Sequence, residues 1–343
     1  MKIVTALPFA HILFKHWGPT DEEGLAVIVK GSFAIRPDGH LEVMAQPEPL
    51  LESDLYFGDP ATSSLRAEQD LAPDKPRTDV TFDLVARAPG DAPLTDWPVS
   101  VEIPGRAFYA FHVRGPCHWE KRRGGWQLSR PTPVREVPIR YELAFGGQAE
   151  GKDGPETFAF NPVGLGFVTD HRLSQDQPVA APQIGDLAEF AVTDIRKSMT
   201  VHGLGPLAKT WLPRRAEAGT FDDRWKATRH PRMPLDYSFG FWNAAPRRLQ
   251  MDPYLRGDEQ IRLQGFHHDS AAQSLTLPRV GLCLHRDGED GTPLRMNLTD
   301  VQIDMSHETP TQHRATLIWR LFLPRADNVS RLRVDPIALE DTA

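Results

Sequence analysis

The sequence has only two cysteines, Cys117 and Cys283, among its 343 residues. Two thiols cannot form a disulfide framework. A single bridge between them stays open, but we expect reduced thiols in a cytoplasmic protein. No stretch approaches the roughly 20 apolar residues of a membrane-spanning helix. The apolar start, residues 3–9, is interrupted by Pro8, so we expect a first strand there instead of a signal peptide.

Sequence motifs for catalysis or cofactor binding are also missing. There is no Gly-x-Ser-x-Gly elbow and no phosphate-binding loop. Gly164 and Gly166 lack the third glycine and the following helix of a dinucleotide site. Cys283 and His285 would share one face of a strand, but no partner pair lies at zinc-site spacing. We therefore expect no catalytic residue, no cofactor and no metal site.

The balance of charge argues against two classes of partner. The net charge is −7, whereas binding to nucleic acid or to an anionic membrane requires a clustered basic surface. The basic clusters, residues 121–123 and Arg247-Arg248, are short and typical of solvated turns. The sequence thus predicts neither a nucleic-acid partner nor a membrane partner.

Turn-forming residues are abundant, with 31 prolines and 26 glycines. They separate short stretches in which apolar and polar residues alternate, as strands with one wet face require. We expect strands at residues 25–35, 78–85, 139–145, 301–305 and 317–323. The last of these has apolar residues on both faces, which predicts a central strand.

Helical periodicity is scarce, and only residues 184–190 and 222–227 fit one or two helical turns. Closely spaced strands without intervening helices predict an all-β fold of mainly antiparallel sheets, sandwich or barrel-like, with long Pro/Gly-rich loops. We expect residues 1–343 to form a single domain. The polar stretch 148–156 reads as a loop or a linker, and it leaves open two subdomains, 1–147 and 157–335.

The most distinctive stretch is residues 219–253, where four prolines exclude a long helix and large rings are frequent. A stiff backbone that carries such rings can anchor a protein partner, because Trp, Tyr and Arg are enriched at binding hot spots. The same rings can instead pack an irregular loop onto a sheet. The candidate partner-binding residues are Arg224, Trp225, Tyr237, Phe241 and Trp242.

Carboxylates provide an alternative interpretation. Asp222-Asp223, Asp236 or Asp258-Glu259 could supply the carboxylate pair of a glycoside hydrolase. Exposed rings on a β fold can also stack on sugars. The alternative is therefore a carbohydrate-binding or carbohydrate-active all-β protein, which two convergent carboxylates in an aromatic-lined groove would favour.

Several further motifs follow one another in a consistent order over nearly the whole chain. They are Lys30-Gly31-Ser32-Phe33, Lys75-Pro76-Arg77-Thr78-Asp79-Val80, Tyr141-Glu142-Leu143-Ala144-Phe145-Gly146-Gly147, Asn161-Pro162-Val163-Gly164-Leu165-Gly166-Phe167, Gly203-Leu204-Gly205-Pro206, the block 219–246, Gly257-Asp258-Glu259, Leu277-Pro278, Thr299-Asp300 and Trp319-Arg320. Together they resemble the bacterial family known as "domain of unknown function 2169". The chain departs from the family's pattern at residues 115–119, at Tyr237-Ser238 and at Arg247-Arg248.

The resemblance implies a function that does not involve catalysis. Family members are described as chaperones or adaptors of type VI secretion effectors. The resemblance therefore implies a cytoplasmic protein that holds a cognate effector and helps to load it onto the secretion spike. Its partners would be the secreted effector and a spike or spike-tip protein. An assembly component of the secretion apparatus itself is a third possibility. If the departures contact the client, this chain differs from its relatives in client preference.

Overall fold

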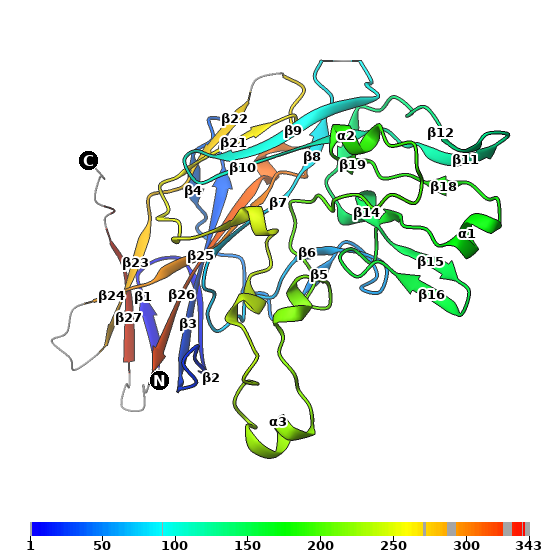
Figure 1. The fold of residues 1–343 in the computed structure, drawn as a ribbon. Coiled ribbons are helices and arrows are strands. Elements are labelled where there is room, and N and C mark those ends of the chain that lie inside the picture. Colours follow the sequence, from blue (N-terminus) through cyan, green and yellow to red (C-terminus); the bar gives the residue numbers. More distant parts are fainter. Residues whose placement is uncertain are drawn as a thin grey trace.

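Figure 1 shows the computed structural model of the chain, which describes residues 2–90, 92–269, 272–286, 293–324, 331–337 and 339. Strands make up 42% of the structure and helices 10%, and the helices are short. Most strand pairs are antiparallel, with parallel exceptions such as β25 beside β7. The predicted all-β fold is therefore confirmed.

The largest sheet has seven strands in the order β2-β3-β26-β25-β7-β20, with β4 paired to β3. These strands are β2 (Ala10–Trp17), β3 (Glu23–Ile35), β4 (Leu41–Val43), β7 (Thr78–Asp83), β20 (Gln250–Met251), β25 (Asn297–Asp304) and β26 (Arg314–Pro324). β3 is buried along nearly its whole length and β26 along most of it, because apolar residues occupy both faces. β26 lies between β3 and β25, which confirms the central strand predicted for residues 317–323.

A second sheet has five strands in the order β19-β10-β9-β21-β22. These are β9 (Asp96–Ile103), β10 (Ala107–Arg114), β19 (Ile184–Gly185), β21 (Gln260–Gln264) and β22 (Gln273–Thr276). Along β9 and β21 buried residues alternate with more exposed ones, so each strand buries one face. That face shares one hydrophobic core with the seven-stranded sheet, in which Val99 and Val101 join Val29 and Leu317. The two sheets thus pack on a common core, as in a sandwich.

A third sheet brings the two ends of the chain together in the order β1-β27-β23-β24. Its strands are β1 (Lys2–Thr5), β23 (Gly281–Arg286), β24 (Leu294–Arg295) and β27 (Arg331–Ile337), with β1 parallel to β27. The strand expected at the N-terminus is therefore present and ends at Thr5.

The remaining strands form one three-stranded sheet, β12-β11-β18, and the two-stranded pairs β13-β8, β14-β17, β15-β16 and β5-β6. Their bounds are β5 (Leu55–Tyr56), β6 (Leu65–Ala67), β8 (Val85–Arg87), β11 (His118–Arg122), β12 (Gly125–Leu128), β13 (Glu136–Pro138), β14 (Phe145–Gly146), β15 (Gln148–Gly151), β16 (Gly154–Thr157), β17 (Leu165–Gly166) and β18 (Val179–Ala180). Several of these lie to one side of the sandwich, on the right in Figure 1.

The helices are short, of one to two turns, and lie in the segments between strands. They are α1 (Asp170–Ser174), α2 (Leu187–Phe190) and α3 (Asp223–Thr228), with the 3₁₀ helices η1 (Tyr141–Leu143), η2 (Arg214–Glu217), η3 (Phe239–Trp242), η4 (Arg247–Leu249) and η5 (Pro310–Gln312). α3 begins where the carboxylate of Asp222 accepts the amide proton of Trp225 at 2.7 Å. α2 and α3 fall in the two stretches predicted to be helical. In the part of the chain that the structure describes, no helix is long and apolar enough to cross a membrane.

The strand predicted for residues 139–145 is wrong. The chain closes a 3₁₀ turn there, with the Leu143 amide donating to the Arg140 carbonyl at 3.0 Å, and only Phe145–Gly146 is extended as β14. The buried rings that suggested a pleat pack in different directions, Tyr141 on Trp211 and Phe145 on Phe158. The apolar alternation of the sequence is not matched by alternating burial, since Leu143 is only partly buried and Ala144 is buried.

The polar stretch 148–156 is not a loop or a linker but the hairpin β15–β16, in which Glu150 pairs with Pro155. Its turn contains Gly154 at φ +131°, a conformation that glycine adopts readily. The division into 1–147 and 157–335 stays a prediction, but strands from both ranges interleave in the seven-stranded sheet. Both cysteines are buried and free, as expected for reduced thiols.

Candidate functional site

The chain leaves the body of the protein between η2 and η3 as a projecting arm, residues 218–238, which carries α3 near its tip (Figure 1). The five candidate partner-binding residues fall into two groups along this arm. Arg224 and Trp225 lie on α3 at the tip. Tyr237, Phe241 and Trp242 lie at the base, where the chain returns to the sheets. The structure therefore separates residues that the sequence suggested as one site.

The tip of the arm exposes apolar groups to solvent. The rings of Phe221 and Trp225 meet edge to face, with centroids 4.7 Å apart. The indole N–H of Trp225 donates to the Arg232 carbonyl at 2.8 Å, which fixes the orientation of the ring. Phe221 is 54% exposed, and Leu235, on the side of the arm that returns to the base, is 83% exposed. Arg224 is exposed on the same tip and Trp225 is half-buried.

The three candidate rings at the base are half-buried and pack on one another. Phe241 lies between Tyr237 and Trp242, at centroid distances of 5.9 and 5.6 Å. The guanidinium of Arg214 lies over the ring of Phe241 at 5.4 Å. Trp242 also meets the ring of His16 on β2, at 6.4 Å. These contacts attach the arm to the sandwich, in line with the packing interpretation of the rings.

A second attachment joins the arm to the turn between β2 and β3. The guanidinium of Arg229 donates two hydrogen bonds to the carboxylate of Asp21, at 3.0 and 2.9 Å. The guanidinium of Arg232 lies 5.2 Å from the centre of the Trp17 ring. A bidentate pair of this kind fixes orientation as well as distance. The arm is thus held at its base and again close to its tip.

The two sides of the arm are also joined to each other. The backbone amide and the hydroxyl of Thr220 both donate to the carboxylate of Asp236, at 3.0 and 2.7 Å. Nearer the base, the Ser238 hydroxyl donates to the carboxylate of Glu217 at 2.8 Å. Side-chain bonds thus link the two sides of an arm that contains no sheet.

A network of buried charges lies beneath the base of the arm. Lys75 Nζ donates to Asp300 at 2.7 Å and to Asp79 at 2.8 Å, and it lies 3.5 Å from Glu68. The network contains four cations and four carboxylates, each at most 4% exposed: Lys30, Lys75, Arg214, Arg320, Glu68, Asp70, Asp79 and Asp300. Their formal charges cancel. Balanced pairing is what allows charges to be buried at all, because an unpaired ion in the interior costs several kcal/mol or more.

The electrostatics of the network differ from one carboxylate to the next. Burial alone would raise the pKa of Asp300, but Arg320 and Lys75 outweigh it and lower that pKa to about 2. The pKa of Asp79 is raised by burial, although Lys75 opposes the shift. For Lys75, burial would lower the pKa, yet Asp300 and Asp79 raise it well above its ordinary value. Asp79 is therefore the carboxylate most sensitive to the loss of its cation.

Two members connect this network to the base of the arm. Arg214 pairs with Glu68 and donates to the carbonyl of Phe241 at 2.7 Å. Asn243, directly after η3, donates its side-chain N–H to Asp79 at 3.0 Å. The position of the arm is thus coupled to the buried charges by hydrogen bonds.

The network gathers charged residues of the motifs noted in the sequence, among them Lys30, Lys75, Asp79, Asp300 and Arg320. The sequence did not predict that they meet. The sequence does indicate that buried charges exist, because Lys30 and Arg320 each lie alone in the middle of a strongly apolar strand. Such a charge must have a partner, but the partners come from distant parts of the chain.

A cleft of about 510 Å³ opens on the face of the seven-stranded sheet and bears on the carbohydrate alternative. Two carboxylates, Asp83 and Asp304, converge in it from adjacent strands. Arg66 donates to both, each at 3.0 Å, and neutralises part of their charge. Phe82 is the one Phe, Tyr or Trp among its described lining residues, and it is 3% exposed. The pair therefore lacks the aromatic lining that sugar stacking requires.

The chain is an all-β protein with a projecting arm and a network of buried charged residues, several of which belong to the motifs noted in the sequence. The model of the family described as "Uncharacterized protein conserved in bacteria (DUF2169)" matches residues 20–320, and the chain belongs to this family. This confirms the family resemblance of the motifs. No curated protein and no solved structure matches the chain.

Proposed function

We propose that this chain is a non-enzymatic chaperone or adaptor that binds a cognate type VI secretion effector and assists its loading onto the secretion spike. The motif resemblance supplies the biological setting. The single structural observation that supports it is the projecting arm, which carries Arg224 and Trp225 on α3 and exposes the apolar side chains of Phe221 and Leu235. Its partners would be the effector and a spike or spike-tip protein, and it would act in the cytoplasm, where loading precedes export.

The tip has the properties of a contact surface between proteins. Large rings and arginine dominate binding energy when they are presented on a fixed backbone. Here the Trp225 ring is oriented by a hydrogen bond, and the arm is attached through Arg229. An arm that is already ordered loses less conformational entropy when its partner binds. Exposed apolar residues on an ordered projection thus favour a polypeptide client.

The edge strand β2 adds a second contact for that client. β2 is the terminal strand of the seven-stranded sheet in the described strand order, so one edge of its backbone is not paired within that sheet. Sheet edges can accept an additional strand from another polypeptide. The arm reaches this region through the contact of Arg232 with Trp17, and Trp242, just beyond the arm in η3, meets His16. A client segment at the β2 edge would therefore lie next to the arm.

The test is co-expression with a type VI effector encoded beside this chain. We expect the effector to be more soluble with the chain than without it and to co-purify with it. Replacing both Phe221 and Leu235 by Ala should weaken binding about 10- to 100-fold, because each removes an exposed apolar contact. Equal effector solubility and secretion with and without the chain would contradict the proposal.

A matched control separates binding from folding. Trp126 is half-buried on β12, in a sheet that the arm does not belong to. Trp126→Ala should leave the affinity for the effector unchanged. Trp242→Ala, at the base of the arm, should instead lower the free energy of unfolding by about 2 kcal/mol, roughly half the cost for a fully buried ring. If Trp126→Ala weakened binding as much as the double replacement of Phe221 and Leu235, the arm would not be the contact surface.

A further inference from the structure

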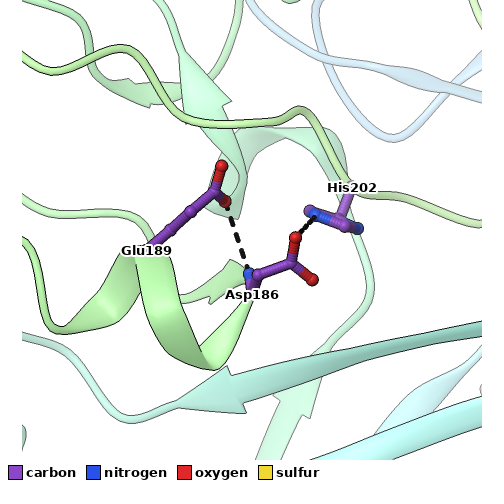
Figure 2. A group of neighbouring side chains, drawn as sticks. All are labelled: Asp186, Glu189 and His202. Atoms are coloured by element: carbon purple, nitrogen blue, oxygen red, sulfur yellow. Dashed lines mark hydrogen bonds and ion pairs between the residues drawn. The ribbon is translucent and has the colours of Figure 1, made fainter.

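Three side chains converge near α2, on the side of the molecule that carries β10 and β19. Figure 2 shows Asp186, Glu189 and His202, whose candidate ligand atoms all lie within 4.8 Å of one another. Asp186 caps α2 and Glu189 lies three residues further on, so one helical turn places both carboxylates on the same side. His202 comes from the loop that follows and faces them.

The decisive atom is Nε2 of His202. The residue is 1% exposed, and this nitrogen has no hydrogen-bond partner. It faces Asp186 Oδ2 at 3.4 Å. That separation exceeds the usual range of about 2.7–3.2 Å for an N–H···O hydrogen bond. It matches the distance of about 3.4 Å between two ligands of a tetrahedral ion with metal–ligand bonds of about 2.0–2.1 Å.

Hydrogen bonds to neighbouring residues orient the side chains of His202 and Glu189. The second ring nitrogen of His202, Nδ1, lies 3.2 Å from the hydroxyl of Tyr109 on β10. Glu189 Oε1 accepts from the amide and the hydroxyl of Thr200, at 2.8 and 2.9 Å. Its other oxygen, Oε2, makes only a long contact of 3.5 Å with the Asp186 amide. Such outer partners are what orient histidine and carboxylate ligands in metal sites.

The charges also fit a cation. Burial lowers the pKa of His202, although Asp186 and Glu189 oppose the shift, so at neutral pH the imidazole is uncharged and can act as a ligand. Arg248, whose guanidinium lies over the Tyr109 ring, is the positive charge that acts on this group. Two carboxylates against one guanidinium leave an excess negative charge. The Asp186 side chain is 48% exposed, which gives an ion access from solvent.

We propose that His202 Nε2 and the carboxylates of Asp186 and Glu189 bind one divalent transition-metal cation of the Zn²⁺ type, with water in the fourth position. An imidazole with two carboxylates suits Zn²⁺ or Co²⁺ better than Mg²⁺ or Ca²⁺, which prefer oxygen ligands throughout. The ion would tie the α2 segment to β10 through Tyr109. This site could not be predicted from the sequence, because the candidate histidine and cysteine ligands considered there are close neighbours along the chain. This inference does not depend on the proposed chaperone function.

The experiment is a titration of the full, untagged chain after removal of metals with a chelator. ZnCl₂ is followed by calorimetry and CoCl₂ by the visible absorption of the bound ion. We expect one equivalent of each metal to bind and thermal stability to rise with Zn²⁺. Binding should weaken as pH falls, because the imidazole must be neutral to bind the metal. MgCl₂ should bind at least tenfold more weakly than ZnCl₂.

Two near-isosteric variants locate the ion. Asp186→Asn and Glu189→Gln should each lower Zn²⁺ affinity at least about tenfold and remove the Co²⁺ absorption. Glu120→Gln is the matched control, since Glu120 also contacts a histidine, His118, but belongs to no three-residue group of candidate ligands among the residues that the structure describes. It should bind like the wild type. Absence of saturable Zn²⁺ binding, or equal binding by the Asp186→Asn and Glu189→Gln variants, would overturn the proposal.

Discussion

Replacing Lys75 by methionine tests whether the buried network stabilises the fold through charge balance. Methionine retains most of the side-chain volume but removes the cation shared by Asp300, Asp79 and Glu68. Asp300 keeps Arg320 as a partner. Asp79 retains only neutral donors among its described contacts, the Asn243 side chain and the Ala244 amide. Removing one partner of a buried pair costs about 3–5 kcal/mol, and we expect a loss of this size at pH 7.

The stability lost in the Lys75→Met variant should become smaller as pH falls. Burial already raises the pKa of Asp79, and without Lys75 it should rise further. A carboxyl whose pKa is raised in the folded state binds a proton more tightly there, so the variant recovers stability as pH falls through that pKa. One proton recovers at most about 1.36 kcal/mol per pH unit, or about 2.7 kcal/mol between pH 7 and pH 5.

The assay is urea unfolding followed by tryptophan fluorescence at pH 7 and at pH 5. Lys209→Met is the matched control, since Lys209 touches Glu68 from the rim and its side chain is 26% exposed. It should cost no more than about 1 kcal/mol. Adding Asp79→Asn to Lys75→Met should restore part of the lost stability. A Lys75→Met cost below 1 kcal/mol at pH 7, or a cost no smaller at pH 5, would refute the reasoning.

Two further predictions concern Gly219 in the arm and His202 in the protein after metal removal. Gly219→Ala should lower the free energy of unfolding by more than about 1–2 kcal/mol, because φ is +73° and a Cβ would lie 3.1 Å from Tyr237. Gly105→Ala, at φ +72° in open space, should show only the backbone cost, and equal losses would rule out the crowding. In chelator-treated protein the lowered pKa of His202 should make stability, complete above pH 6.5, decline as pH falls below it. His202→Gln should lose this dependence in urea unfolding, and an unchanged profile would exclude His202 as its source.

The distribution of apolar and polar residues along short stretches was sufficient to predict the fold class and the central strand. Leu317 and its neighbours are apolar on both faces, and a strand buried on both faces is the simplest structure that satisfies this. The strand predicted for residues 139–145 was wrong for a physical reason. Alternating apolar residues indicate a strand only when one layer covers the apolar face, and Tyr141 and Phe145 are covered by different neighbours. A single sequence carries no information about which neighbour that is.

The sequence singled out residues 219–253 as distinctive but did not predict how the candidate residues are arranged, and their role in partner binding stays a prediction. Within the block 219–253, residues 219–238 form a projecting arm outside the sheets, whereas Gln250–Met251 pairs with β7 as β20. The separation of Trp225 from Trp242 could not be predicted, since both are rings in the same stretch. What distinguishes them is Arg214, whose bond to the Phe241 carbonyl fixes the base. The Asp186, Glu189 and His202 group was missed because its carboxylates and its histidine lie on different segments.

The residues at which the chain departs from the family pattern lie in two separate regions of the structure. Tyr237-Ser238 lies at the base of the arm, and Arg247-Arg248 lies in η4 shortly after it. Residues 115–119 lead into β11, which Figure 1 shows well away from the arm. One compact client surface cannot include both regions. If the departures tune client preference, exchanging Tyr237-Ser238 for Phe-Asp should change which effector binds, whereas changes at residues 115–119 should not.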